Sequence, residues 1–315
     1  MSFDPSALPS LTSKVYLVTG GNAGIGYHTA RQLALHGARV YIGSRSLSKA
    51  SDAIAKIKAE APNADVHFLH MDLMDLSSVV KAADEFKQKE DRLNGLVNNA
   101  GIMATPFAKS EKDGFEAQWE TNYLSHWVLT WHLLDTLAKT AKEEGSPAGN
   151  ARVVNLTSNG HKAAPKRGID FDDLDQKNGG IWSRYGMSKL ANILHVKKLN
   201  KLYGPQGSEG EKTGIWTAAV HPGFVDTDLN KQTDGPSFIQ PALKCLGVYK
   251  KPEEGAYTTL FAVAASEFKQ SNSGEYFEPV AKKGKPSKHA SNMELADQLW
   301  EWTVVEMRKR KLLEQ

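Results

Sequence analysis

The sequence contains little cysteine: one residue of 315, Cys245. A single thiol excludes an internal disulfide and is typical of proteins that fold in a reducing compartment. Long apolar runs are missing too, because no window approaches the roughly 20 apolar residues that a membrane-spanning helix needs. The N-terminal residues show no positively charged segment followed by an apolar run, so they do not resemble a signal peptide. We therefore expect a cytoplasmic protein without a transmembrane segment.

The chain also lacks a strong excess of charge of either sign. It has 39 Lys and Arg against 36 Asp and Glu, for a net charge of +3, and no basic stripe interleaved with aromatic residues. This distribution disfavours nucleic acid as a partner. His161, His195 and His221 have no Cys or acidic neighbours at ligand spacing, so we expect no metal site. The length suits a single α/β domain.

Short apolar runs alternate with helical stretches along the chain. We expect seven strands, at residues 14–19, 39–43, 66–70, 93–97, 152–157, 215–220 and 275–278. The main helices are expected at residues 24–36, 46–60, 77–89, 115–141 with a break near Thr121, 182–202, 253–266 and 293–313. The strands are uniformly apolar, which favours a parallel sheet buried on both faces. The predicted fold is α/β: a single domain with a doubly wound, mostly parallel seven-stranded sheet and helices on both faces.

The unusual polar and glycine-rich segments follow the strands. They are residues 20–26, Ser44-Arg45, Asp72, residues 98–101, Ser158 and Pro222-Gly223. Because ligands of such sheets bind outside the carboxyl ends of the strands, these segments predict one shared binding site.

The first of these segments contains Gly20, Gly24 and Gly26 between a strand and a helix. Glycine allows a sharp turn and a close approach of the backbone to a pyrophosphate, and a helix N-terminus favours the anion. The pattern predicts a dinucleotide site.

The second strand ends in Gly43-Ser44-Arg45 and lacks the carboxylate that would bind the 2′-hydroxyl of NAD. Arg suits a phosphate in charge and in geometry. We therefore expect NADP(H) in preference to NAD(H). A solvated Arg45 is the alternative, because Ala23 adds no second basic group within the glycine loop.

Tyr185 and Lys189 are four residues apart, which places both side chains on one face of a helix. A free phenol has a pKa of roughly 10, and a neighbouring cation lowers it. The pair therefore predicts a general acid or base. Taken alone, such a pair also arises by chance on surface helices.

Together these residues resemble the short-chain dehydrogenase/reductase superfamily over about residues 12–280. The shared motifs are Thr19-Gly20-x-x-x-Gly24-x-Gly26, Asn98-Asn99-Ala100-Gly101, Ser158, Tyr185-x-x-x-Lys189 and Pro222-Gly223. Within it the chain looks like the branch of retinol dehydrogenases and WW-domain-containing oxidoreductases. That likeness rests on Asn99-Ala-Gly-Ile-Met103, Ser158-x-x-His161, Phe171-Asp-Asp-Leu174 and Tyr185-Gly-x-Ser-Lys-Leu-Ala-Asn192. The resemblance implies a Rossmann-type oxidoreductase that interconverts a carbonyl and an alcohol.

The resemblance also implies roles for single residues. Tyr185 would donate a proton to the carbonyl oxygen as hydride arrives, and Ser158 would hydrogen-bond that oxygen. Lys189 would bind the nicotinamide ribose and lower the pKa of Tyr185, and Asn122 would hold a water in the proton relay. Asp72 would contact adenine, Asn99 the adenosine side, and Val225 and Thr227 the carboxamide. The full set of implied cofactor contacts is Gly20, Asn22, Gly24, Ile25, Gly26, Ser44, Arg45, Asp72, Leu73, Asn99, Ala100, Gly101, Tyr185, Lys189, Pro222, Gly223, Val225 and Thr227.

Outside this core, residues 12–227, the chain divides into two further parts. Residues 228–251 contain Phe238, Ile239, Leu243, Leu246 and Val248, an apolar lid candidate or a satellite of the core. A lid of this kind predicts a hydrophobic aldehyde or ketone as substrate. Residues 291–313 form a C-terminal helix with a basic end, which suits packing on the core or peripheral contact with a membrane. Monomer and homodimer, paired through helices 115–141 and 182–202, both stay open.

Two other functions are alternatives. A non-catalytic dinucleotide sensor or scaffold commonly loses Tyr, Lys or Ser from the site, and all three are present here. A sugar-nucleotide epimerase or dehydratase on a related scaffold is disfavoured by the element at residues 98–101 and by the absence of a larger C-terminal substrate domain.

Overall fold

The computed structural model describes residues 3–143, 145–208, 213–226 and 249–313. Cys245, Thr227 and residues 228–248 of the expected lid lie outside the described residues.

The centre of the molecule is a sheet in the order β3-β2-β1-β4-β5-β6-β7-β8. Its strands are β1 (Val15–Thr19), β2 (Arg39–Ser44), β3 (Val66–His70), β4 (Gly95–Asn98), β5 (Arg152–Leu156), β6 (Trp216–Val220), β7 (Glu275–Glu278) and β8 (Lys282–Lys283). The seven expected strands are all present, and they pair in parallel with one another. The eighth, β8, pairs antiparallel with β7. It was not predicted, because two exposed lysines show none of the apolar pattern of the other strands.

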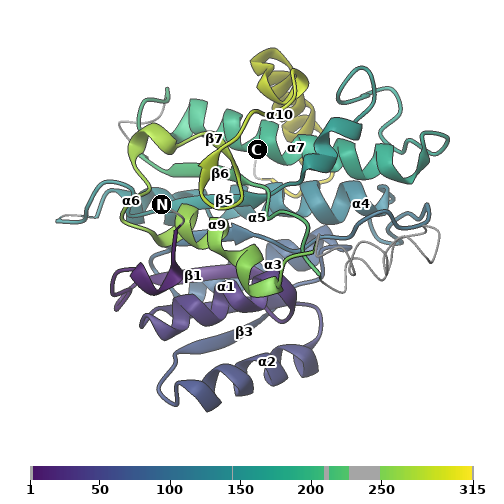
Figure 1. The fold of residues 1–315 in the computed structure, drawn as a ribbon. Coiled ribbons are helices and arrows are strands. Elements are labelled where there is room, and N and C mark those ends of the chain that lie inside the picture. The colour runs from purple at the N-terminus through teal and green to yellow at the C-terminus, as the bar shows by residue number, and fades with distance from the viewer. Residues whose placement is uncertain (1–2, 144, 209–212, 227–248, 314–315) are drawn as a thin grey trace.

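Helices cover both faces of this sheet (Figure 1). They are α1 (Gly24–Leu35), α2 (Leu47–Glu60), α3 (Leu76–Lys89), α4 (Ala117–Trp119), α5 (Ser125–His132), α6 (Leu134–Ala141), α7 (Gly180–Tyr203), α9 (Pro252–Ala264) and α10 (Met293–Lys309). Short 3₁₀ turns include η1 (Pro5–Ala7), η3 (Asn159–Ala163), η5 (Gln270–Asn272) and η6 (His289–Ser291), whereas η2 (Glu120–Leu124) is π-helical. The break expected near Thr121 is this π-helical turn, and a second break follows at Leu133.

Alternate residues of each buried strand enter two separate hydrophobic cores. In β1, Val15 and Leu17 join the core under α3, α5, α7 and α10, whereas Tyr16 and Val18 join the core under α1, α2 and α9. This alternation follows from the period of two along a strand, and it confirms the doubly wound fold expected from the uniformly apolar runs.

The C-terminal helix α10 packs against α5 and α7. The ring of Trp300 lies 5.2 Å from Trp127 and 6.0 Å from Trp131, centroid to centroid. Asp297 accepts hydrogen bonds of 2.8 Å from Lys198 and Lys201 on α7. The apolar face of α10 is therefore buried against the protein's own core. Among the described residues, no helix combines the length and the apolarity needed to span a bilayer.

Candidate active site

The carboxyl ends of β1 and β4 are joined by one hydroxyl group. Thr19 Oγ1 accepts hydrogen bonds from the backbone N–H groups of Asn99 (2.9 Å) and Ala100 (3.0 Å). In return, Asn99 Nδ2 donates to the carbonyl of Thr19 at 2.7 Å. Between β1 and β4 the strand order reverses, and this is the point where dinucleotides bind in doubly wound sheets.

The glycine loop between β1 and α1 leaves no room for side chains. Gly20 has a φ of +65°, which favours glycine. A Cβ on Gly26 would lie 2.4 Å from both the Gly20 carbonyl oxygen and Asn99 Nδ2. The N-cap of α1, Ala23, makes no side-chain capping bond, and the first turn holds no acidic residue. The backbone N–H groups of this helix start are thus suited to a pyrophosphate, so the loop fits a dinucleotide.

The ends of β2 and β3 lie at the same edge. Ser44 is buried and accepts a hydrogen bond from the Ser46 N–H at 3.3 Å, whereas Arg45 is exposed. Ser46 caps α2 by accepting from the Lys49 N–H, and the first turn of α2 has no acidic residue. Asp72 Oδ1 accepts from the Met74 N–H at 3.0 Å and thereby closes the turn after β3. The region around Arg45 therefore favours an anion.

Ser158, Tyr185 and Lys189 meet where β5 ends beside α7. Tyr185 is buried and hydrogen-bonded to Ser158, whose Oγ also accepts from the Gly160 N–H at 3.0 Å. Lys189 Nζ lies 5.8 Å from the centroid of the Tyr185 ring and donates to the Leu156 carbonyl at 3.2 Å. The three side chains that the sequence singled out are thus close together, as the predicted chemistry requires.

The expected effect of Lys189 on Tyr185 is wrong for this structure. Burial raises the pKa of Tyr185 to about 12, and the hydrogen bond with Ser158 lowers it only in part. Burial likewise lowers the pKa of Lys189 to about 8. Desolvation dominates because both groups are deep in the protein and the ammonium is bonded to a backbone carbonyl. Tyr185 is therefore protonated at neutral pH and chemically able to donate a proton.

Asn122 lies in the π-helical turn η2 and connects two parts of the site. Its Oδ1 accepts from the Ile102 N–H at 2.9 Å, and its Nδ2 donates to the Ile102 carbonyl at 3.0 Å. Nδ2 also donates to Ser188 Oγ at 2.9 Å, on the same helix as Tyr185. Both amide hydrogens of Asn122 are thus used, and the side chain links residues 98–102 to α7.

The other expected contacts also lie at this edge. Pro222 and Gly223 follow β6, and Val225 is buried and forms a single parallel bridge with Lys250. The Leu73 carbonyl accepts from Ser125 Oγ at 2.7 Å, whereas Thr227 is not among the described residues. Within the described parts of the chain no group of three metal-ligating side chains occurs.

Two residues of the site were not assigned a role from the sequence. Thr19 was noted only as part of a motif, although it joins β1 to Asn99 and Ala100. His126 was not noted, although its ring contacts both Thr19 and Asn122. Its spacing of four residues from Asn122 on a helix was the available sign.

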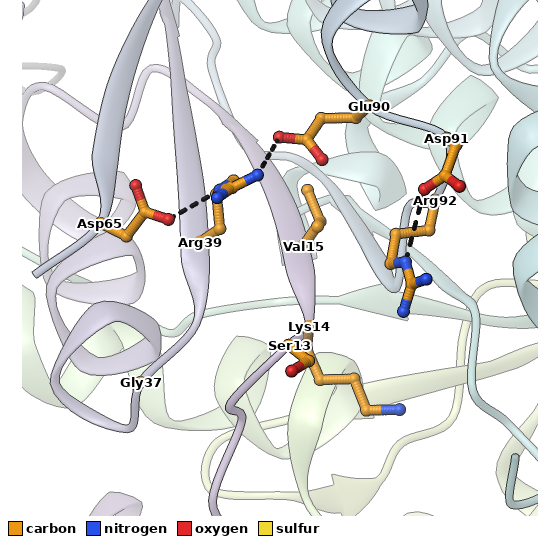
Figure 2. Close-up of a pocket in the computed structure, with 9 residues that line it drawn as sticks. All are labelled: Ser13, Lys14, Val15, Gly37, Arg39, Asp65, Glu90, Asp91 and Arg92. Atoms are coloured by element: carbon orange, nitrogen blue, oxygen red, sulfur yellow. Dashed lines mark hydrogen bonds and ion pairs between the residues drawn. The ribbon is translucent and has the colours of Figure 1, made fainter.

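A cavity of about 460 Å³ lies at the opposite, amino edge of the sheet (Figure 2). There Arg39 donates to Asp65 at 2.7 Å and to Glu90 at 3.0 Å. Lys14 is hydrogen-bonded to Asn150 and Arg92 to Asp91, so each basic side chain of the cavity has a partner. Arg39 and Arg92 are thus paired with carboxylates, whereas Lys14 has the neutral amide of Asn150 as its partner.

The comparisons with known proteins agree with this geometry. The family model for short chain dehydrogenase matches residues 14–169. The chain is 64% identical over 310 residues to the short-chain dehydrogenase/reductase drtF of Aspergillus calidoustus, an alignment that covers 98% of both chains. It is 38% identical to polyprenol dehydrogenase of Homo sapiens, over 93% of this chain and 84% of that protein. It is 37% identical to retinol dehydrogenase 12 of Mus musculus, over 92% of this chain and 85% of that protein.

Among solved structures, the chain is similar to the Pseudomonas aeruginosa RhlG/NADP active-site complex. The TM-score is 0.64 and the sequence identity 25%, and the match covers 86% of this chain and 96% of that chain.

Proposed function

Because the chain belongs to the short-chain dehydrogenase/reductase family, and within it to a retinol dehydrogenase-like branch, we propose that it interconverts a carbonyl and an alcohol on a hydrophobic small molecule with NADP(H). Like its family, it is an oxidoreductase that uses a nicotinamide dinucleotide. The observation that best supports the proposal is the buried, protonated Tyr185, hydrogen-bonded to Ser158 and close to Lys189 at the dinucleotide edge.

In the proposed reaction, Tyr185 donates its phenolic proton to the substrate oxygen during reduction and recovers it during oxidation. Ser158 donates a second hydrogen bond to that oxygen and stabilises the developing alkoxide. The nicotinamide supplies or accepts the hydride. Lys189 binds the adjacent ribose and, as a cation, stabilises the Tyr185 phenolate left after reduction until a proton from solvent restores the phenol. The relay water at Asn122 stays a prediction.

The chain's own residues suit each part of the dinucleotide. The pyrophosphate is assigned to the loop with Gly20, Asn22 and Ile25 at the start of α1, where the backbone N–H groups lack side-chain partners. The adenosine is assigned to Asp72, Leu73 and residues 99–101, and the nicotinamide to residues 222–225. Arg45 and the start of α2 are assigned to the 2′-phosphate, which is the basis for NADP(H) over NAD(H).

Two exposed aromatic side chains next to the site favour an apolar substrate. Trp182 is 50% exposed, and its ring lies 6.2 Å from the Tyr185 ring. Phe224, which follows Gly223, is 61% exposed. Two relatives are named for retinol and polyprenol, both apolar alcohols, and this agrees with the same substrate class.

We further propose that the protein is a monomer. Homodimer formation through the helices at residues 115–141 and 182–202 needs their outer faces to be free. In this chain, α10 packs on those faces through Trp300 and Asp297.

The proposal is tested by calorimetric binding of NADPH and NADH to the wild type, Arg45→Ala and Arg45→Lys. We expect tight NADPH binding that Arg45→Ala weakens by about tenfold, the effect of losing one charge-assisted hydrogen bond, with NADH affected within about twofold. Arg45→Lys retains the charge and loses the planar fork, so an intermediate value is expected. Equal losses for both cofactors would contradict the assigned 2′-phosphate contact, and failure to bind either would contradict the proposed function.

A further inference from the structure

His126 connects the dinucleotide edge to the helix turn that contains Asn122. It lies on α5 and is almost fully buried. Its Nε2 is 2.9 Å from Thr19 Oγ1, and its Nδ1 is 3.1 Å from the Asn122 carbonyl oxygen. A single ring therefore contacts both the strand end that orients Asn99 and Ala100 and the backbone of Asn122.

The surrounding atoms determine which nitrogen of His126 bears the proton. A carbonyl oxygen accepts only, so Nδ1 is the donor to Asn122. Burial lowers the pKa of His126 to about 4, so the ring is neutral at pH 7 and Nε2 is an acceptor. The Thr19 hydroxyl consequently donates to Nε2.

This assignment uses every hydrogen-bonding position of the Thr19 hydroxyl. Its proton points to His126, and its two lone pairs accept from the Asn99 and Ala100 N–H groups. The other acceptor within reach, the Val97 carbonyl, is farther away at 3.4 Å. The arrangement is a complete and directional network, so loss of the ring leaves buried groups without partners at both ends.

From Asn122 the network continues to the candidate catalytic helix. Asn122 Nδ2 donates to Ser188 Oγ, and Ser188 in turn donates to the Tyr185 carbonyl at 2.8 Å. The Asn122 turn is π-helical, a geometry that is rare in proteins and frequent at functional sites.

We propose that His126 is a positioning residue that links the dinucleotide-binding residues Asn99 and Ala100 to Asn122 and the Tyr185 helix. The proposal rests on the proposed function. The two ring nitrogens of His126 have separate roles. Nε2 orients Asn99 and Ala100 through Thr19, and Nδ1 orients the turn that contains Asn122.

Two variants of His126 each retain one of its two hydrogen bonds and lose the other. In His126→Asn the amide nitrogen takes the place of Nδ1, and the contact with Thr19 is lost. In His126→Gln the amide reaches the place of Nε2, and the contact with the Asn122 carbonyl is lost. For each variant, NADPH affinity is measured by calorimetry and kcat is measured with a hydrophobic aldehyde as substrate. Thermal unfolding is measured in the absence of cofactor.

We expect His126→Asn to weaken NADPH binding about tenfold and to change kcat within about twofold. We expect His126→Gln to lower kcat about tenfold or more and to change NADPH affinity within about twofold. Thr19→Val, which also removes the acceptor of the Asn99 and Ala100 N–H groups, should weaken NADPH binding at least as much as His126→Asn, and Thr19→Ser should match the wild type. The Thr19 pair tests the link if a His126 variant does not fold.

His195→Gln is the matched control. His195 is also buried, its pKa is lowered by burial to about 3, and its Nδ1 is 3.1 Å from Asn155 Nδ2. We expect His195→Gln to reduce thermal stability, and we expect it not to change NADPH affinity and kcat by different factors. The proposal is overturned if both His126 variants change affinity and kcat by the same factor, or if neither changes them. A wild type that binds no dinucleotide would instead overturn the proposed function.

Discussion

The two edges of the sheet differ in how their charged and polar side chains are partnered. At the amino edge, Arg39 lies between the carboxylates of Asp65 and Glu90 (Figure 2). The Tyr41 hydroxyl also donates to Glu90, at 2.8 Å. At the carboxyl edge, burial is the only cause of the lowered pKa of Lys189, and it is the largest cause of the raised pKa of Tyr185.

This difference between the two edges distinguishes charged groups that stabilise the fold from charged groups that are able to bind a ligand. A buried charge that is paired within the fold has no capacity left for a ligand, whereas an unpaired one destabilises the fold and retains its capacity to bind. Groups whose pKa is strongly shifted are common at functional sites. The carboxyl edge therefore has the character of an active site, and the amino edge that of a structural ion-pair cluster.

The largest effect is expected from Tyr185→Phe, which removes the proton donor and preserves the ring. Loss of a general acid should lower kcat by about 10²–10⁴-fold. NADPH affinity, measured by calorimetry, should stay within about twofold of the wild type, because few contacts with the cofactor are lost. Tyr203→Phe, at the far end of α7, is the control and should leave kcat unchanged. A Tyr185→Phe protein that retains full turnover would contradict the assigned role.

The second effect is on stability. Because burial lowers the pKa of Lys189 to about 8 from 10.5, the unfolded chain binds more protons than the folded protein between these values. Stability should therefore rise with pH across that window, and at pH 7 the ammonium destabilises the fold. Lys189→Met should raise the free energy of unfolding at pH 7 by on the order of 3 kcal/mol, and the gain should shrink towards pH 10.5.

Urea unfolding at pH 7 and pH 10 measures this gain. Lys201→Met, which replaces a half-exposed lysine paired with Asp297 on the same helix, is the control and should produce no gain. A loss of stability in Lys189→Met at pH 7 would show that the ammonium is paired after all.

Much of this division was predictable from the sequence. The uniformly apolar strands predicted a parallel sheet. The glycines and polar residues that follow the strands predicted that the binding site lies at the carboxyl edge of this sheet. Those inferences succeed because they depend on local patterns: the period of two in a strand, the helix start after a glycine turn, and the Tyr-x-x-x-Lys spacing.

What escaped prediction depends on tertiary packing. The direction of the Tyr185 pKa was wrong because spacing reveals the neighbouring Lys189 but not the depth of burial that outweighs it. The link through His126 was missed because Thr19 lies 107 residues away from it in the sequence. The π-helical turn at Glu120–Leu124 has no pattern of its own beyond a break in helix periodicity.

A third, smaller effect concerns a buried carboxyl group next to the Asn122 turn. Burial, followed by the nearby Asp113 carboxylate, raises the pKa of Glu120 to about 9 from 4.5. The folded protein then binds more protons than the unfolded chain between these values, so stability should fall as pH rises through that window. Glu120→Gln does not ionise and should gain on the order of 2 kcal/mol relative to the wild type between pH 5 and about pH 6.5.

Thermal unfolding across this pH range tests the prediction. Glu116→Gln is the contrasting variant, because Glu116 lies 3.4 Å from the buried guanidinium of Arg184. Its loss should destabilise the protein at every pH in the range, since the buried Arg184 then keeps its charge without a carboxylate beside it. Parallel pH profiles for Glu120→Gln and the wild type would refute the assignment of Glu120 as a protonated group.

The smallest effect is expected at the amino edge. Glu90→Gln retains an acceptor for the Tyr41 hydroxyl and loses only the charge that faces the half-exposed Arg39, so it should cost about 1 kcal/mol. Glu90→Leu removes both acceptors and should cost about 2–3 kcal/mol, because the buried Tyr41 hydroxyl then has no partner. Urea unfolding measures both losses, and neither variant should change kcat or NADPH affinity. Because Glu90 lies across the sheet from Tyr185, a change in kcat without a change in affinity would show that the two edges are coupled and that the division between them is wrong.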